Sequence, residues 1–143
     1  MKLVDLNLLL YAVNEDSAEH TAAKRWWEAT MNGDEQVGLA WPVVTGFLRL
    51  STRRGVLPSP LTVTRALDMA EQWIDHPLTV LVHPGDRHWS LLRGLLEQTG
   101  TGGNLTTDAH LAALALEYEA TLCSSDRDYR RFKGLKVDDP LRR

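Results

Sequence analysis

The stretch Lys2-Leu3-Val4-Asp5 decides the fold, because it is a short apolar run that ends at an acid and is followed at once by a helical pattern. Four more short apolar runs follow at residues 36–40, 79–83, 120–124 and, more briefly, 135–137. Short strands that alternate with helices are typical of a mostly parallel sheet with helices on both faces. We therefore expect an α/β fold of three layers, α/β/α, around a central sheet of four to five short strands.

Apolar residues recur at helical spacing between these runs, most clearly at Val63, Ala66, Leu67, Ala70, Trp73 and Ile74. The sequence Asp16-Ser-Ala-Glu19 predicts a capping box at the start of one helix, and Pro42 suits the first turn of another. Asp86 is a candidate N-cap for a helix that glycines 100–103 end. Trp27 adjoins Trp26 and cannot face the same way, so we expect it to mark an interface.

Composition indicates an ordinary globular protein. The chain has 143 residues, 43% of them hydrophobic and 24% charged, which predicts a single domain over residues 1–143. Cys123 is the only cysteine, which excludes a disulfide framework and a cysteine-based zinc cluster. No apolar run has the length of a membrane span, and Asp5 and Asn7 interrupt the apolar start as they would not in a signal peptide. We expect a cytoplasmic protein without a membrane segment.

The net charge is −3, so the chain has no overall basic field for nucleic acid. Residues 127–143 are the exception, with seven basic against three acidic residues, which makes this segment +4 and the preceding 126 residues −7. Such a segment either binds a phosphate chain or is solvated surface, and the sequence leaves both interpretations open.

Four aspartates fall where a parallel sheet would bring them together. Asp5, Asp126 and Asp128 follow predicted strands, and Asp108 lies in the first turn of a predicted helix that begins near Asn104. Ligands of open α/β sheets bind beyond the carboxyl ends of the strands. Ligands that are all oxygen suit Mg²⁺ or Mn²⁺, and a cation relieves the repulsion among clustered acids. Each acid also has a structural explanation as a helix cap or a first-turn charge.

Three stretches of the chain resemble the motifs of PIN domains. They are Val4-Asp-Leu-Asn-Leu-Leu9, Thr107-Asp-Ala-His-Leu-Ala-Ala-Leu-Ala115, and Ser124-Ser-Asp-Arg-Asp-Tyr129 with Phe132. More narrowly, the chain is similar to VapC-type toxin ribonucleases, and Trp41-Pro42 followed by Gly46-Phe-Leu-Arg-Leu50 resembles one branch of them. The resemblance implies a magnesium-dependent endoribonuclease that acts on RNA, forms a homodimer and is blocked by a small antitoxin protein.

The chain departs from the PIN pattern at one position. Most PIN domains have a glutamate three residues before the arginine of the third helix, and here that residue is Gly46, before Arg49. The missing acid puts a second metal ion in doubt. Glu117 falls on the opposite helix face from Asp108, whereas Asn104 shares its face and is a possible supplementary ligand. We further expect the small size of Gly46 to leave room for RNA or a hydrated ion.

The residues suggest a mechanism in which a divalent ion activates water for attack on a phosphodiester. We expect Asp5 and Asp108 to be direct ligands, Asp126 a ligand or a residue that positions the water, and Asp128 an outer-shell group. Substrate-binding candidates are short polar groups beside these acids and three bases after them: Asn7, Ser124, Arg127, Arg130 and Arg131. Ordinary turn chemistry explains the first two equally well.

Two other functions remain possible from the sequence. In phosphatases of the haloacid dehalogenase type, an aspartate after the first strand, here Asp5, is a covalent nucleophile; those enzymes usually have a second aspartate two residues later, where this chain has Asn7. A non-catalytic RNA-binding module on a decayed nuclease scaffold is the other, and the departure at Gly46 motivates it.

Overall fold

In the computed structural model, which describes residues 1–142, five parallel strands form one sheet in the order β3-β2-β1-β4-β5. The strands are β1 (Lys2–Val4), β2 (Val37–Ala40), β3 (Thr79–Val82), β4 (Thr121–Cys123) and β5 (Val137–Asp138). The first strand of the chain lies at the centre, where Lys2 is paired with Val37 on one side and with Thr121 on the other. The predicted α/β class is confirmed, and the sheet is entirely parallel.

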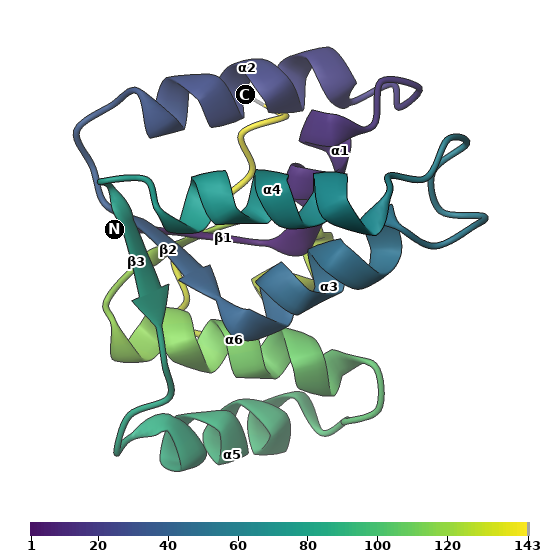
Figure 1. The fold of residues 1–143 in the computed structure, drawn as a ribbon. Coiled ribbons are helices and arrows are strands. Elements are labelled where there is room, and N and C mark those ends of the chain that lie inside the picture. Colours follow the sequence, from purple (N-terminus) through teal and green to yellow (C-terminus); the bar gives the residue numbers. More distant parts are fainter. Residues whose placement is uncertain (143) are drawn as a thin grey trace.

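Helices cover both faces of this sheet. The pair α1 (Leu6–Val13) and α2 (His20–Met31) joins β1 to β2, and α3 (Trp41–Ser51) and α4 (Val63–Ile74) join β2 to β3. The chain then returns past β1 through α5 (His88–Thr99) and α6 (Leu105–Glu117), and a short 3₁₀ helix, η1 (Arg127–Arg131), precedes β5. Figure 1 shows α2 and α4 above the sheet and α5 and α6 below it. The chain moves outward from β1 to β2 and β3 and then crosses back to β4. Because right-handed crossovers in opposite directions lie on opposite faces of a sheet, α1–α4 and α5–α6 cover different faces.

The core lies between these layers. The strands are short and nearly continuous in apolar residues, as expected where both faces of a parallel sheet are covered. Leu3 and Val4 of β1, Leu39 of β2 and Leu122 of β4 are all fully buried. Cys123, in β4, is also buried and packs as a small core residue.

Some helix ends differ from the sequence predictions. α2 begins at His20 without a side-chain cap, because the Ser17 hydroxyl accepts from the Glu19 N–H in a turn that precedes the helix. Asp86 does not cap α5, which begins at His88 without a side-chain cap on its N-cap residue. Pro42 lies in the first turn of α3, and Gly100 ends α5 in the left-handed conformation, both as predicted.

Trp27 belongs to the core, so the prediction that it marks an interface is wrong. Its side chain is 7% exposed, and its ring meets that of Trp73 edge-on with centroids 5.8 Å apart. Trp26 is buried as well, and its ring centroid lies 6.1 Å from that of Trp27, so both adjacent tryptophans pack in the core. Among residues 1–142, no helix has the length and apolar character needed to cross a membrane.

Candidate metal centre

Asp5 stands at the carboxyl edge of the sheet, directly after the central strand. Its backbone N–H donates to the carbonyl of Cys123 in the neighbouring strand, over 3.0 Å. Its Oδ1 accepts from the N–H of Leu6 over 2.8 Å, which caps the first turn of α1. Backbone groups therefore hold Asp5 in two ways: β4 bonds its main chain, and the start of α1 bonds its side chain.

Three further carboxylates gather beside it. Asp108 lies in the first turn of α6, Asp126 is the N-cap of η1, and Asp128 lies in the first turn of η1. One ligand atom from each lies within 4.8 Å of the other two. We call these three residues the acidic cluster. Asp126 accepts the N–H of Asp128 over 2.9 Å, so the turn itself holds two of the three together.

Two hydroxyl groups connect Asp5 to the acidic cluster. The buried hydroxyl of Ser124 donates to Asp5 Oδ2 over 2.6 Å and accepts from the N–H of Asp126 over 3.0 Å. The phenol of Tyr129 lies 3.4 Å from Asp5 Oδ1 and 3.3 Å from Asp108 Oδ1. Asp5 is thus joined to Asp126 through one hydroxyl and to Asp108 through another.

The electrostatics agree with this geometry. Burial and the charges of Asp126 and Asp5 raise the pKa of Asp108 to about 6. Burial also raises the pKa of Asp5, although hydrogen bonds from Ser124 and Leu6 oppose it by favouring the charged form. Burial and the nearby carboxylates raise the pKa of the Tyr129 phenol. Without a cation, the site therefore penalises its own negative charge.

The donor set fits a hard divalent cation. All the ligand atoms of the acidic cluster are carboxylate oxygens, the donors that Mg²⁺ and Mn²⁺ prefer. Two oxygens bound to one Mg²⁺ are at most about 4 Å apart, so the 4.8 Å spacing needs only small side-chain movements to accept the ion. Asp126 caps η1 and Asp5 caps α1, and both stand at the same edge of the sheet, so a structural role of these acids is compatible with a functional one.

The substrate-binding candidates have different surroundings. Ser124 is 1% exposed with its hydroxyl engaged by Asp5 and Asp126, which favours orienting a carboxylate over contacting a phosphate. The amide of Asn7 donates to the hydroxyl of Ser125 over 3.0 Å, and its Oδ1 is buried without a partner. Asn7 is therefore held against the loop that follows β4, close to the acids.

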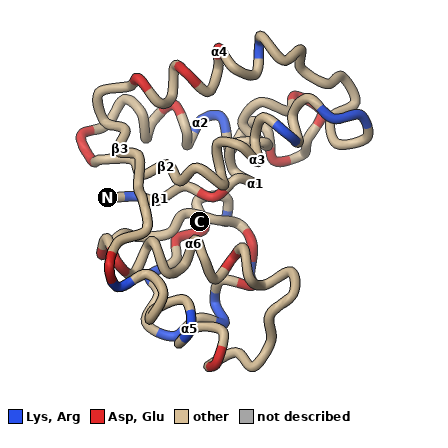
Figure 2. Tube along the Cα trace, turned by 60° about the horizontal axis from the view of Figure 1, so that its bottom comes forward, with Lys and Arg blue, Asp and Glu red and all other residues tan. Residues whose placement is uncertain are grey.

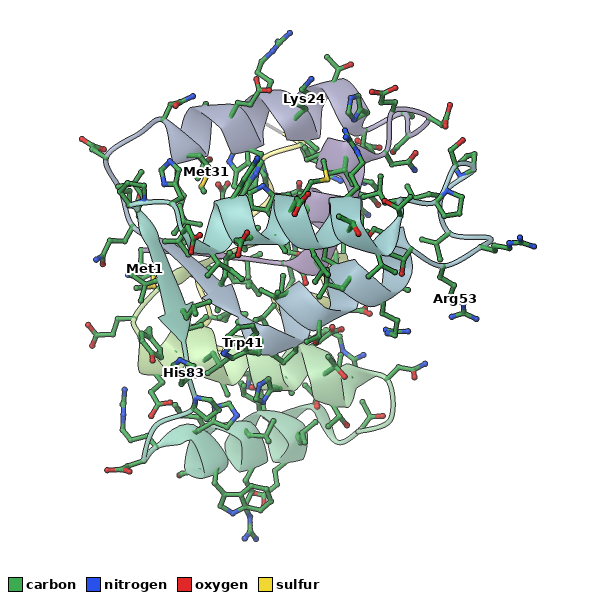
Figure 3. All side chains as sticks on the ribbon, in the orientation of Figure 1. Met1, Lys24, Met31, Trp41, Arg53 and His83 are labelled. Atoms are coloured by element: carbon green, nitrogen blue, oxygen red, sulfur yellow. The ribbon has the colours of Figure 1, made fainter. Side chains whose placement is uncertain are left out.

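The basic residues lie at the surface. Arg127, Arg130 and Arg131 are exposed on η1, the element that also carries Asp128. Arg142 forms an ion pair with Asp139 over 3.1 Å, so part of the predicted basic segment is neutralised within the chain; Arg143 lies outside the described residues. Figure 2 shows basic residues at several separate places along the trace, and Figure 3 shows Arg53 extending away from the body of the molecule.

The space beside Gly46 is filled, contrary to the expectation that it leaves room for RNA or a hydrated ion. A Cβ atom on this buried glycine would lie 2.7 Å from Cδ2 of Leu6, the residue after Asp5. Gly46 therefore faces the start of α1, where the side chain of Leu6 takes up the volume. Neighbouring residues in the sequence gave no indication of this contact.

The two substitutes for the missing glutamate can now be placed. The carboxylate of Glu117 accepts the N–H groups of Gly85 and Arg87 over 2.8 and 3.1 Å, so it secures the loop before α5, as its place on the opposite helix face requires. Asn104 is exposed at the N-terminus of α6 and makes no side-chain cap bond.

Tyr129 is the site residue that sequence reasoning missed. It was part of the stretch that resembles PIN domains, but no role was predicted for it. Its spacing from Asp126 and Asp128 gives no sign that a 3₁₀ turn directs its hydroxyl back between two carboxylates from distant parts of the chain.

Comparisons with known proteins show the family of this chain. The family model described as the PIN domain matches residues 2–135. Ribonuclease VapC37 of Mycobacterium tuberculosis is 44% identical over 140 residues, covering 98% of this chain and 97% of that protein. Ribonuclease VapC33 of the same species is also 44% identical, over 142 residues and 99% of both chains.

Solved structures share the fold. VapBC2 from Rickettsia felis, bound to a DNA fragment from its promoter, has a chain that matches with a TM-score of 0.69 at 14% identity, covering 96% of both chains. VapC20 of M. tuberculosis, described as a toxin that cleaves the sarcin-ricin loop, matches with a TM-score of 0.68 at 18% identity, covering 95% of this chain and 99% of that one. With a PIN model matching nearly its whole length and ribonucleases at 44% identity, this chain belongs to the PIN-domain family and, within it, to the VapC ribonucleases.

Proposed function

We propose that this protein is the toxin of a toxin–antitoxin pair, an endoribonuclease that depends on Mg²⁺, with Mn²⁺ as a substitute. The observation that carries the proposal is the acidic cluster, joined by hydroxyl groups to Asp5 at the carboxyl edge of the sheet. The names of the relatives support the reaction class, since the two most similar proteins reported above are ribonucleases.

The chain's own residues divide the work of the reaction. Asp108, Asp126 and Asp128 would hold the ion, and Asp5 would complete the site from its more buried side. A bound divalent ion lowers the pKa of water and neutralises charge that develops on the phosphate. Ser124 fixes the orientation of Asp5 relative to Asp126.

Residues around the acids receive the RNA. The exposed bases Arg127, Arg130 and Arg131 contact phosphates that flank the scissile bond, and they reach it because η1 carries them next to Asp128. Asn7 contacts the substrate or orients the loop after β4 through its bond to Ser125. Asn104, at the start of the helix of Asp108, remains a supplementary ligand by its amide oxygen.

A phosphatase that uses Asp5 as a nucleophile is less consistent with the site. Both oxygens of Asp5 already accept hydrogen bonds, from Leu6 and from Ser124, which leaves neither free for attack on a phosphate. The family match is to PIN domains. The other alternative, a non-catalytic RNA-binding module, would be eliminated by metal-dependent RNA cleavage in the assay described below.

The partners follow from the relatives. The structural relatives include VapBC complexes and a toxin–antitoxin complex from Klebsiella pneumoniae. We propose that a small antitoxin binds this chain and blocks its site, that the toxin acts in the cytoplasm, and that it forms a homodimer.

A cleavage assay tests the proposal. Purified protein should cut RNA with Mg²⁺ or Mn²⁺ and lose this activity in chelator. Asp5→Asn and Asp108→Asn should each abolish cleavage, because the amide keeps the shape and removes the charge that holds the ion. Asp75→Asn is the matched control, since this exposed acid precedes β3 and so lies toward the opposite edge of the sheet. Full activity in chelator, or in both site variants, refutes the metal mechanism.

A further inference from the structure

The side chain of Tyr129 is held rigidly between two parts of the site. Its ring is buried, with 2% of the residue exposed, and it packs against Phe132 with centroids 6.2 Å apart. Its hydroxyl lies at nearly equal distances, 3.4 and 3.3 Å, from Oδ1 of Asp5 and Oδ1 of Asp108. These two acids are separated by more than 100 residues of chain and come from different elements, so Tyr129 is a direct link between them.

The chemistry of a phenol limits what this link does. The ordinary pKa of a phenol is about 10, and the surroundings of Tyr129 raise it, so the group is protonated at neutral pH and has a single proton to donate. Both distances exceed the usual O–H···O length of about 2.7–2.8 Å, so both hydrogen bonds are long. Because the hydroxyl has one proton, it donates to one carboxylate at a time.

A phenylalanine would fill the same core volume without placing a hydroxyl against two acids. Burying a hydroxyl costs free energy unless the group is hydrogen-bonded, and here its partners are the two carboxylates. Each carboxylate oxygen of Asp5 already accepts another hydrogen bond, Oδ1 from Leu6 and Oδ2 from Ser124. What the phenol adds is the connection to Asp108.

We propose that Tyr129 is a positioning residue, which holds Asp5 and Asp108 in place for a divalent cation. Its hydroxyl donates a hydrogen bond to whichever of the two carboxylates has the less compensated charge. The inference rests on the proposed function, because it concerns the same site. Before the cation binds, the proton reduces repulsion between the two acids. When a cation engages Asp108, the hydroxyl turns to Asp5 and keeps that carboxylate charged and aligned.

Calorimetric titration of metal-free protein with Mn²⁺ tests the proposal without any RNA. Tyr129→Phe should weaken Mn²⁺ binding about tenfold, the lower range for loss of a group that orients metal ligands. Tyr118→Phe is the matched control, because it also removes a tyrosine hydroxyl, one bonded to the backbone of His83 away from the acids, and should leave the affinity unchanged. Thermal unfolding in chelator verifies that both variants are folded.

A second variant separates positioning from packing. Phe132→Leu disturbs the ring against which Tyr129 packs but keeps the hydroxyl. A role in packing alone predicts that Phe132→Leu weakens Mn²⁺ binding as much as Tyr129→Phe does, and that result overturns the proposal, as does unchanged affinity in Tyr129→Phe. A Tyr129→Phe protein that unfolds in chelator also overturns the proposal, because the hydroxyl then supports the fold rather than the cation site.

The failure of this inference is distinguishable from that of the proposed function. Unchanged Mn²⁺ affinity in Tyr129→Phe, together with metal-dependent RNA cleavage by the wild type, overturns the role of Tyr129 and leaves the function intact. Weaker Mn²⁺ binding in Tyr129→Phe without RNA cleavage by the wild type supports the role of Tyr129 and refutes the function.

Discussion

Replacing Asp108 with asparagine should stabilise the metal-free protein at neutral pH while abolishing its response to metal. The charged form of this carboxyl is disfavoured in the folded state, where burial and the charges of Asp126 and Asp5 raise its pKa to about 6. Asparagine keeps an oxygen that accepts from Tyr129 and removes the charge. The substitution therefore relieves a cost that the wild type carries only in the absence of a cation.

The magnitude follows from the pKa of Asp108. A rise from 3.8 to about 6 corresponds to about 3 kcal/mol of unfavourable free energy on ionisation. Asp108 is only half-buried, and solvent screening reduces this figure to about 1–2 kcal/mol. A protein of this size then gains about 5 °C in melting temperature.

The pH dependence has a definite sign. Below about pH 4 the carboxyl is protonated in both the folded and the unfolded states, so it costs nothing. Stability is lost as the pH rises from about 4 through 6, because the unfolded state releases this proton first. The advantage of Asp108→Asn should be small at pH 4, close to the unfolded-state pKa of 3.8, and complete by about pH 7.

Thermal unfolding in chelator at pH 4 and pH 7.5, repeated with Mg²⁺ at pH 7.5, provides the measurement. Mg²⁺ should raise the melting temperature of the wild type and leave that of Asp108→Asn unchanged. The reasoning is refuted if the variant is less stable than the wild type in chelator at pH 7.5, or if it gains equally at both pH values.

Four further outcomes are expected. Replacing Arg127, Arg130 and Arg131 together should lower the salt dependence of RNA binding by up to about three units of slope, one for each lost phosphate contact, and an unchanged slope would mark them as solvated surface. RNA products should carry 5′-phosphate and 3′-hydroxyl ends, since water attacks phosphorus directly; end-group analysis that finds 2′,3′-cyclic phosphate contradicts this. Gly46→Ala should leave the free energy of urea unfolding nearly unchanged in the wild type but raise it by about 1 kcal/mol in a Leu6→Ala background. In that background the close contact with Leu6 is gone, while alanine still favours the helix more than glycine does. Equal effects in both backgrounds would show that there is no contact. Trp27→Ala should lower the free energy of unfolding by about 3–5 kcal/mol, whereas a residue at an interface would change the oligomeric state instead.

The fold was predictable from the sequence because its signals are local. Short apolar runs separated by helical periodicity indicate a parallel sheet, and the positions of Pro42 and Gly100 depend only on backbone conformation. The starts of α2 and α5 were not predictable in the same way. Asp16 and Asp86 have the side chains of good caps, but turns before each helix and the contacts of Glu117 decide where the helices begin.

The site was partly predictable for a related reason. Topology alone brings Asp5, Asp108 and Asp126 to one edge, since the carboxyl ends of parallel strands lie together. What joins these acids depends on side-chain directions across more than 100 residues of chain. The hydroxyl of Tyr129 between two carboxylates and the side chain of Leu6 against Gly46 have no counterpart in spacing or composition.

The central place of β1 has a consequence for how the protein is made. The central strand β1 needs residues 121–123 as its neighbour, so the inner part of the sheet forms only when the chain through Cys123 has been synthesised. Asp5 meets Ser124 and Tyr129 at that same late moment. A polypeptide that stops before Ser124 therefore lacks both hydroxyl groups that hold Asp5, and it cannot assemble the acidic site.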